Sequence, residues 1–218
     1  MTTLASSTLR NLHTWVPLPQ AAFLAESSMR EINRIIDEHL LPDGMIQTQP
    51  SRALSVLGCT MARFYFKTAL SLTKEARSSA ISGISENFLR STPSRLIVDQ
   101  GWLTIDFTDF FLATENSLHS LETIKSFFES DPDVMSGEHV FKQTRIPVHM
   151  VTELLANGEN MQDILKAYPA LDEARIAAAV KFVAAFPRRG RPSRSEQVKD
   201  KVISQRAIRV TRHVQAAD

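Results

Sequence analysis

The chain has little of several residue types, and each shortage excludes a class of protein. Its 218 residues include a single cysteine, Cys59, so no disulfide can form within the chain, which is typical of the reducing cytoplasm. No apolar run approaches the roughly 20 residues that a membrane-spanning helix requires. Residues 1–10 are polar and contain no apolar signal core. We therefore expect a cytoplasmic protein that does not enter a membrane.

Glycine is also scarce, with 7 in the chain, and there is no glycine-rich phosphate-binding loop or nucleophile elbow. The histidines show no spacing typical of a zinc site. The best cluster for metal chemistry is Asp131, Asp133, Glu138 and His139, but aspartates in such a turn commonly cap backbone N–H groups. We predict no catalytic residue, no metal and no cofactor. A metal-dependent hydrolase using Asp131, Asp133 and His139 is the alternative, which metal analysis of the purified protein would test.

Positive charge is concentrated at one end of the chain. Residues 188–218 contain 9 of the 25 lysines and arginines but only 3 of the 24 acidic residues. This segment therefore has a balance of +6, whereas residues 1–187 have a balance of −5. A basic tail on an acidic body indicates a polyanion or an acidic protein surface as the partner of the tail. A solvated tail without a partner is the alternative.

Two short helices are predicted near the beginning of the chain. The first covers 18–25, and the second runs from Ser28 to about Leu40. Ser28 and Glu31 have the spacing of a capping box, which marks the start of the second helix. Two helices joined by about three residues have helix-turn-helix geometry. A polar linker or wing follows at 43–52.

The second of these helices has a polar face that suits DNA. Arg30, Asn33 and Arg34 lie away from its apolar stripe. Arginine can donate two hydrogen bonds to guanine, and asparagine can pair with adenine. Ser27 and Ser28, with the helix N-terminus, form a candidate phosphate site. We predict DNA contacts from all five residues. The alternative is a helical hairpin whose arginines meet only water.

The middle of the chain is predicted to be helical with one β-hairpin. Apolar stripes predict helices over 52–72 and 73–90, and two extended runs around a glycine-containing turn predict a hairpin at 96–106. A further helix is expected to begin near Phe107 and to continue through 117–129. These stripes are typical of a protein core or a dimer interface.

A short strand and three helices are predicted after this section. Val140, Phe141 and Ile146 favour the strand. The three predicted helices are 148–156, 160–168 and 172–186. Ile176 and Val180 are expected on the buried stripe of the third helix, which is also rich in alanine. Alanine suits close helix packing better than phosphate contacts, so we interpret these helices as a dimerisation or docking module.

The segment from Asp131 to Pro147, with the helices after it, resembles domain of unknown function family 433, a small domain associated with antitoxins. The matching residues are Asp131, Pro132, Gly137, Val140, Thr144, Arg145, Ile146, Pro147, Val148, Gly158, Tyr168 and Pro169. The chain departs from the family pattern at Ser136 and Gln143, where glycine is usual, and at His139, where proline is frequent.

The front of the chain resembles the MerR-like helix-turn-helix of VapB-type antitoxins that carry this domain. The similarity rests on Leu-x-x-Ala-Ala-x-Leu-Ala at 18–25 and Ile-x-x-Ile-Ile at 32–36. The glycine that is usual in the turn is replaced here by Glu26 or Ser27. Together the two resemblances imply a DNA-binding antitoxin.

The resemblance also implies a toxin partner for the tail. The basic run after residue 185 resembles the tail of VapB-type antitoxins, which lies across a PIN-like toxin and places an arginine in its acidic metal site. Planar arginine cations on an extended segment suit carboxylates. The implied toxin-binding residues are Phe186, Arg188, Arg189, Arg191 and Arg194. The Arg189-Gly190-Arg191-Pro192 run is also the core of an AT-hook, which binds the DNA minor groove.

The predicted architecture is mainly α, with four parts. These are a helix-turn-helix DNA-binding domain at 1–50, a helical connector with the hairpin at 51–129, a tri-helical, homeodomain-like domain at 130–187 and a basic extended tail at 188–218. We predict a homodimeric antitoxin of a type II toxin-antitoxin system, which neutralises a PIN-like ribonuclease and represses its operon by binding operator DNA. A stand-alone DNA-binding transcriptional regulator without a toxin is the alternative.

Overall fold

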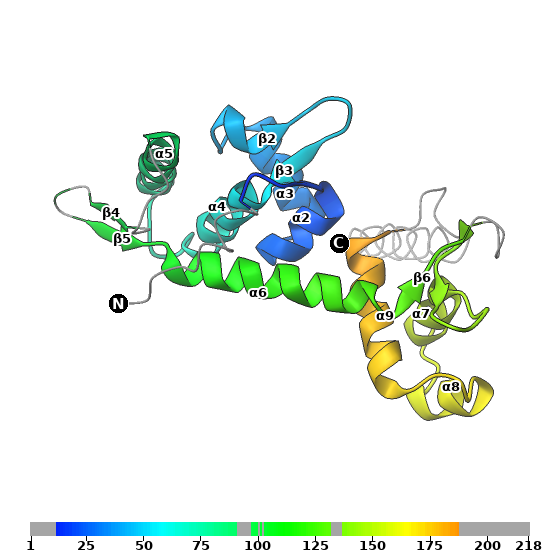
Figure 1. The fold of residues 1–218 in the computed structure, drawn as a ribbon. Helices are drawn as coiled ribbons and strands as arrows, with labels where there is room; N and C mark the ends of the chain where they lie inside the picture. Colours follow the sequence, from blue (N-terminus) through cyan, green and yellow to red (C-terminus); the bar gives the residue numbers. More distant parts are fainter. Residues whose placement is uncertain (1–11, 91–96, 100, 102, 132–136, 188–218) are drawn as a thin grey trace, which may run out of the picture. The chain divides into compact units, whose positions relative to one another are not determined.

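A computed structural model describes residues 12–90, 97–99, 101, 103–131 and 137–187, and it confirms a mainly helical fold with small antiparallel strand pairs (Figure 1). The strands are β1 (Trp15–Pro17), β2 (Ile46–Gln47), β3 (Ala53–Ser55), β4 (Ile97–Asp99), β5 (Thr104–Asp106), β6 (Phe128–Glu129) and β7 (Val140–Phe141). The helices are α2 (Leu18–Ala25), α3 (Met29–Asp37), the 3₁₀ helix η1 (Asp43–Met45), α4 (Val56–Lys67), α5 (Lys74–Arg90), α6 (Thr108–Lys125), α7 (Val148–Ala156), α8 (Met161–Ala167) and α9 (Glu173–Ala185).

Helices α2 and α3 form the predicted hairpin. A proline in the first turn starts α2, and Glu26 ends it in a left-handed conformation with φ of 49°. Ser28 caps α3, and both hydrogen bonds of the predicted capping box with Glu31 are present. Helix α3 ends at Asp37, earlier than the predicted Leu40, because the next residues leave helical geometry, with φ of 49° at His39.

A small sheet follows, in the order β1-β3-β2 with antiparallel pairs. The predicted polar linker or wing is therefore a hairpin of β2 and β3 whose loop is 48–52. The predicted helix from Arg52 was wrong at its start, since Ala53–Ser55 pair with two strands and Ser55 instead caps α4. A Cβ on Gly58 would lie 2.9 Å from the Met45 carbonyl oxygen, so glycine allows α4 to pass close to η1.

The first hydrophobic core lies among α2, α3, α4, α5 and the start of α6. Its largest fully buried side chains are Leu24, Ile32, Ile35, Leu54, Met61, Phe64, Ile81, Ile84, Phe107 and Phe111. The predicted hairpin is confirmed as β4 and β5, which pair with Val98 opposite Ile105. Its Val98 packs closely against Gly83 of α5.

The helix that was predicted near Phe107 is continuous from Thr108 to Lys125. The expected helical end at Phe128 and Glu129 was wrong, because these residues form β6 and pair with β7. Long-range strand pairing therefore overrides the helical pattern of this short segment.

The C-terminal helices agree with the sequence prediction. Asn160 caps α8 and Asp172 caps α9 through their side chains. A second core contains Phe128, Phe141, Val148, Val151, Ile164, Ile176, Ala179 and Phe182. Val180 was wrongly predicted as buried and is 51% exposed, since Ala179 and Phe182 occupy the inner side of α9. Ile146 lies outside β7 and is half-buried against the second core.

Residues 1–187 group into one compact unit, within which α2 packs against α3, α4, α6 and α9. The predicted tail at 188–218 lies outside the described residues. No helix in the described ranges is both long and apolar enough to cross a membrane.

Candidate nucleic-acid interface

The outer side of α3 carries the polar residues that the sequence predicted for DNA contacts. Arg30 and Arg34 are exposed and Asn33 is half-buried, whereas the isoleucines of the opposite side are buried in the first core. The pattern of α3 thus places the three predicted side chains on one face of the helix. Asp37 shares this face, and Glu38 follows directly after it.

Ser27 and Ser28, which were predicted to hold a phosphate, have internal partners. The Ser28 hydroxyl donates to Glu31 Oε2 at 2.8 Å, and the Ser28 N–H donates to the same oxygen at 2.8 Å. The Ser27 hydroxyl donates to the Ala25 carbonyl oxygen at 3.2 Å. The backbone and hydroxyl bonds from Ser28 lower the pKa of Glu31, so its carboxylate already occupies the N-terminus of α3. A phosphate at this position has to displace that carboxylate.

Arg34 belongs to a chain of ion pairs at the end of α3. Its Nε lies 2.8 Å from Glu38 Oε1, and Lys74 Nζ lies 3.6 Å from the other oxygen of Glu38. The hydrogen bond with Glu38 raises the pKa of Arg34, and the same bond lowers the pKa of Glu38. All three side chains are exposed. Helix α3 is thus linked to the start of α5 through a solvated network.

Arg52 is a residue of this face that the sequence prediction did not include. It comes from the loop between β2 and β3, where its Nη1 donates to Asn33 Oδ1 at 3.0 Å and its Nη2 donates to the Asp37 carboxylate. The wing is therefore attached to α3 by a guanidinium group. No local pattern indicates this contact, because its partners lie 19 and 15 residues away.

A buried arginine fixes the turn between α2 and α3. Arg63 of α4 is 4% exposed, and its guanidinium donates to the Leu24 carbonyl oxygen at 3.1 and 2.8 Å and to Ser117 Oγ of α6 at 2.8 Å. It also lies 3.1 Å from Glu26, which is paired with Lys67 at 3.1 Å. The hydrogen bond from Lys67 lowers the pKa of Glu26. Glu26 has a left-handed backbone with φ of 49°, and these two cations hold its side chain in place.

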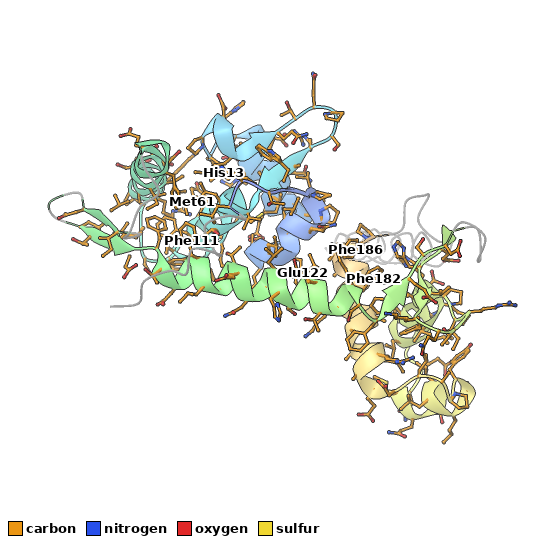
Figure 2. All side chains as sticks on the ribbon, viewed as in Figure 1. His13, Met61, Phe111, Glu122, Phe182 and Phe186 are labelled. Atoms are coloured by element: carbon orange, nitrogen blue, oxygen red, sulfur yellow. The ribbon has the colours of Figure 1, made fainter. Side chains whose placement is uncertain are left out.

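The remaining predicted functional residues lie in the C-terminal part. Phe186 is half-buried, stacks on Phe182 at 4.6 Å between ring centroids, and has Lys125 Nζ 5.0 Å from its centroid (Figure 2). The Phe186 side chain thus packs against the C-terminal domain to which it belongs. The other predicted toxin contacts, Arg188, Arg189, Arg191 and Arg194, lie outside the described residues.

The metal candidates show no common site in the described part of the chain. His139 packs edge-on against Phe182, with ring centroids 5.0 Å apart, and Asp133 lies outside the described residues. No group of three or more acidic, histidine or cysteine side chains in the described residues is arranged to hold a metal. Cys59 is fully buried, and this burial raises the pKa of its thiol. A protonated buried thiol is unsuited to nucleophilic attack.

Comparison with known proteins shows the family to which the chain belongs. Residues 129–183 match the family described as protein of unknown function (DUF433), in agreement with the resemblance of the same segment. The chain is 34% identical over 181 residues to the uncharacterized protein y4eO of Sinorhizobium fredii, an alignment that covers 79% of this chain and 81% of that protein. The crystal structure of Rv2018 from Mycobacterium tuberculosis matches with 14% identity and a TM-score of 0.34. The match covers 76% of this chain and 96% of that chain, and it is too distant to indicate a function. The chain therefore belongs to the same protein family as y4eO, and its residues 129–183 form a DUF433 domain.

Proposed function

We propose that this protein is a DNA-binding antitoxin that recognises its operator through α3 and the wing and neutralises a PIN-like ribonuclease through its basic tail. The observation that carries the DNA-binding part is the polar face of α3. On it, Arg30, Arg34 and the wing residue Arg52 gather on one exposed side of a short helix-turn-helix. Two guanidinium groups on a helix of this length, with a third beside them from the wing, suit the major groove, which admits one α-helix.

The ion pairs of this face are compatible with DNA binding. An exposed pair such as Arg34–Glu38 contributes little to stability, so its release costs little. A bidentate contact of arginine with guanine supplies about 1–3 kcal/mol of discrimination against the wrong base. Arg34 can therefore exchange Glu38 for a base at little cost and gain sequence discrimination. The acidic side chains of the same face disfavour phosphates at other positions and so favour one orientation of the helix.

The toxin-binding part rests on the DUF433 domain and on the charge of the segment that follows it. In the resemblance to VapB-type antitoxins, this domain precedes the toxin-binding tail, and here 9 lysines and arginines lie within residues 188–218. Arginine pairs with clustered carboxylates in a bidentate manner. A PIN-like nuclease presents such carboxylates at its metal site. We place the homodimer contact in the C-terminal domain, and a dimer implies a two-fold operator.

The DNA-binding part is tested with the double substitution Arg30→Ala and Arg34→Ala. The probe is the duplex upstream of the protein's own reading frame. Loss of two base contacts should weaken binding by roughly 100-fold or more. The matched control is Arg145→Ala with Lys166→Ala, which removes two exposed cations from the C-terminal domain and should leave the affinity nearly unchanged. Operator binding that persists in the Arg30/Arg34 variant would mean that α3 is the wrong helix.

The toxin-binding part is tested by co-expression with the product of the neighbouring reading frame. The full-length chain is compared with a chain that stops after Phe186. A stable complex and restored growth that both require the tail are the expected results. If neither form binds that product while the full-length chain still binds the operator, the protein is a stand-alone transcriptional regulator. Light scattering of the full-length chain tests the dimer independently.

A further inference from the structure

Arg52 occupies the middle of the polar face of α3, although it belongs to the wing. Its guanidinium donates to Asn33 at 3.0 Å and to the Asp37 carboxylate, one turn further along the helix. The Arg52 side chain is nevertheless 42% exposed. Since a guanidinium group has five N–H donors, two bonds to α3 leave three for another partner.

Asn33 is poorly placed for the adenine contact that its position suggested. Its amide nitrogen donates to the Met29 carbonyl oxygen at 2.9 Å, and its amide oxygen accepts the bond from Arg52. Pairing with adenine needs both the donor and the acceptor of the amide. Each of these groups already has one partner within the protein, and these partners set the direction of the amide, so we assign Asn33 the role of a support for the arginine.

We infer that Arg52 reads a guanine in the major groove, and that Asn33 and Asp37 are positioning residues that hold its guanidinium over α3. This inference rests on the proposed DNA-binding function and adds a base-specific residue to it. An arginine held by two partners before binding loses less side-chain entropy when it meets a base. Arg34, in contrast, is paired in the described contacts with Glu38, directly after the end of α3. Arg52 is therefore the better-ordered arginine of this face.

The test is selection of binding sites from a pool of random duplexes by the full-length protein, followed by the same selection with Arg52→Lys. The wild-type protein should select a guanine at a fixed position. Lysine keeps the charge but cannot donate two parallel hydrogen bonds to guanine, so discrimination at that position should fall roughly 10- to 100-fold. The slope of log affinity against log salt should stay the same because the charge is retained. Replacing the selected guanine by 7-deazaguanine should weaken the wild type and have little effect on the variant.

The Asp37→Asn variant tests whether Asp37 positions Arg52 for a base or only attaches the wing to α3. Loss of its negative charge should raise the affinity for unrelated duplexes, while the loosened Arg52 should lower the preference for guanine. The control is Arg145→Lys, an exposed arginine in the C-terminal domain, which should leave both unchanged. Urea midpoints of each variant show whether the fold is intact.

The outcomes separate the inference from the function on which it rests. If the wild type selects a site and Arg52→Lys keeps the same guanine preference, Arg52 only attaches the wing and the inference is overturned. If the wild type selects no sequence, the proposed DNA recognition fails together with the inference. A loss of preference at one base position, with an unchanged salt slope, is the result that establishes Arg52 as a reader.

Discussion

The α2–α4 region and the DUF433 domain differ in how far apart in the sequence the partners of their described ion pairs lie. In the first, ion pairs join residues that are far apart in the sequence, such as Arg52 with Asp37 and Arg63 with Glu26. In the DUF433 domain, the described ion pairs of Lys166 with Asp163 and of Arg175 with Asp172 each lie within one helical turn. Its contacts between distant residues include Phe182 against Phe128, at 4.5 Å between ring centroids, and the hydrogen bond from the Gln143 N–H to Glu129.

The two kinds of contact have different consequences: ion pairs orient helices and loops relative to one another, whereas aromatic contacts mainly pack them together. Hydrogen bonds and ion pairs are directional, so those of Arg52 orient the wing on α3, and those of Arg63 orient α4 on the end of α2. Aromatic contacts are broader in geometry and mainly exclude water. A surface that has to match a DNA groove needs fixed side-chain directions, whereas a docking module needs a stable support. This contrast is a further argument for the recognition role that we propose for the first region and the supporting role that we propose for the second.

The largest effect is expected from Phe182→Ala. Phe182 is 2% exposed and touches the rings of Phe128, Phe186 and His139, so its loss leaves a cavity in the second core. The free energy of unfolding should fall by about 3–5 kcal/mol. Urea denaturation followed by circular dichroism measures it, and Val180→Ala on the exposed side of the same helix should cost less than about 0.5 kcal/mol.

The same variant tests whether the two cores unfold together. Phe23 of α2 packs against both the first and the second core. One shifted transition, also followed by the fluorescence of the tryptophans, would indicate a single cooperative unit. A second transition at the wild-type midpoint would show that the α2–α4 region folds without the DUF433 domain, and the comparison would then be between two independent domains.

A smaller effect is expected from Arg63→Met. The substitution keeps the long apolar stem but removes the bonds to Leu24, Ser117 and Glu26. Loss of hydrogen bonds from a buried charged group should cost about 2–3 kcal/mol of the free energy of unfolding. Lys67→Met removes the exposed partner of Glu26 and should cost about 0–1 kcal/mol. Equal urea midpoints for the two variants would mean that the buried arginine does not stabilise the turn.

Sequence patterns predicted the local features of both regions. The capping box at Ser28 depends on polar side chains within three residues of a helix start, and the structure confirms it. Asn160 and Asp172 cap α8 and α9 by equally local contacts. The helical hairpin of α2 and α3 and the β4–β5 hairpin follow from equally local spacing.

Contacts between distant residues were not predictable in this way. The partners of Arg52 and Arg63 lie up to 54 residues away, so the local sequence did not distinguish either arginine from a solvent-exposed one. Phe128 and Glu129 continued a helical pattern, and only pairing with β7 makes them a strand. Val180 fitted the expected stripe, but the small Ala179 beside it lets α9 rotate its inner side toward Phe182. The sequence thus predicted the polar face of α3, whereas it did not indicate that the wing adds Arg52 to this face.

The smallest effect concerns the capping box and its dependence on pH. The pKa of Glu31 is lowered by its bonds from Ser28, so its carboxylate stabilises the folded state at neutral pH. This contribution is fully present above the unfolded pKa of about 4.3 and is lost as the pH falls through the lower folded pKa. Ser28→Ala should cost about 1 kcal/mol at pH 7. It should cost less near about pH 3, where a protonated Glu31 makes weaker bonds with the hydroxyl. Urea midpoints at both pH values measure the difference. The same cost at both pH values would show that the hydroxyl acts only by accepting the Glu31 N–H, which does not titrate. In that case, the charged hydrogen bonds at the start of α3 would stabilise the α2–α4 region less than its comparison with the DUF433 domain implies.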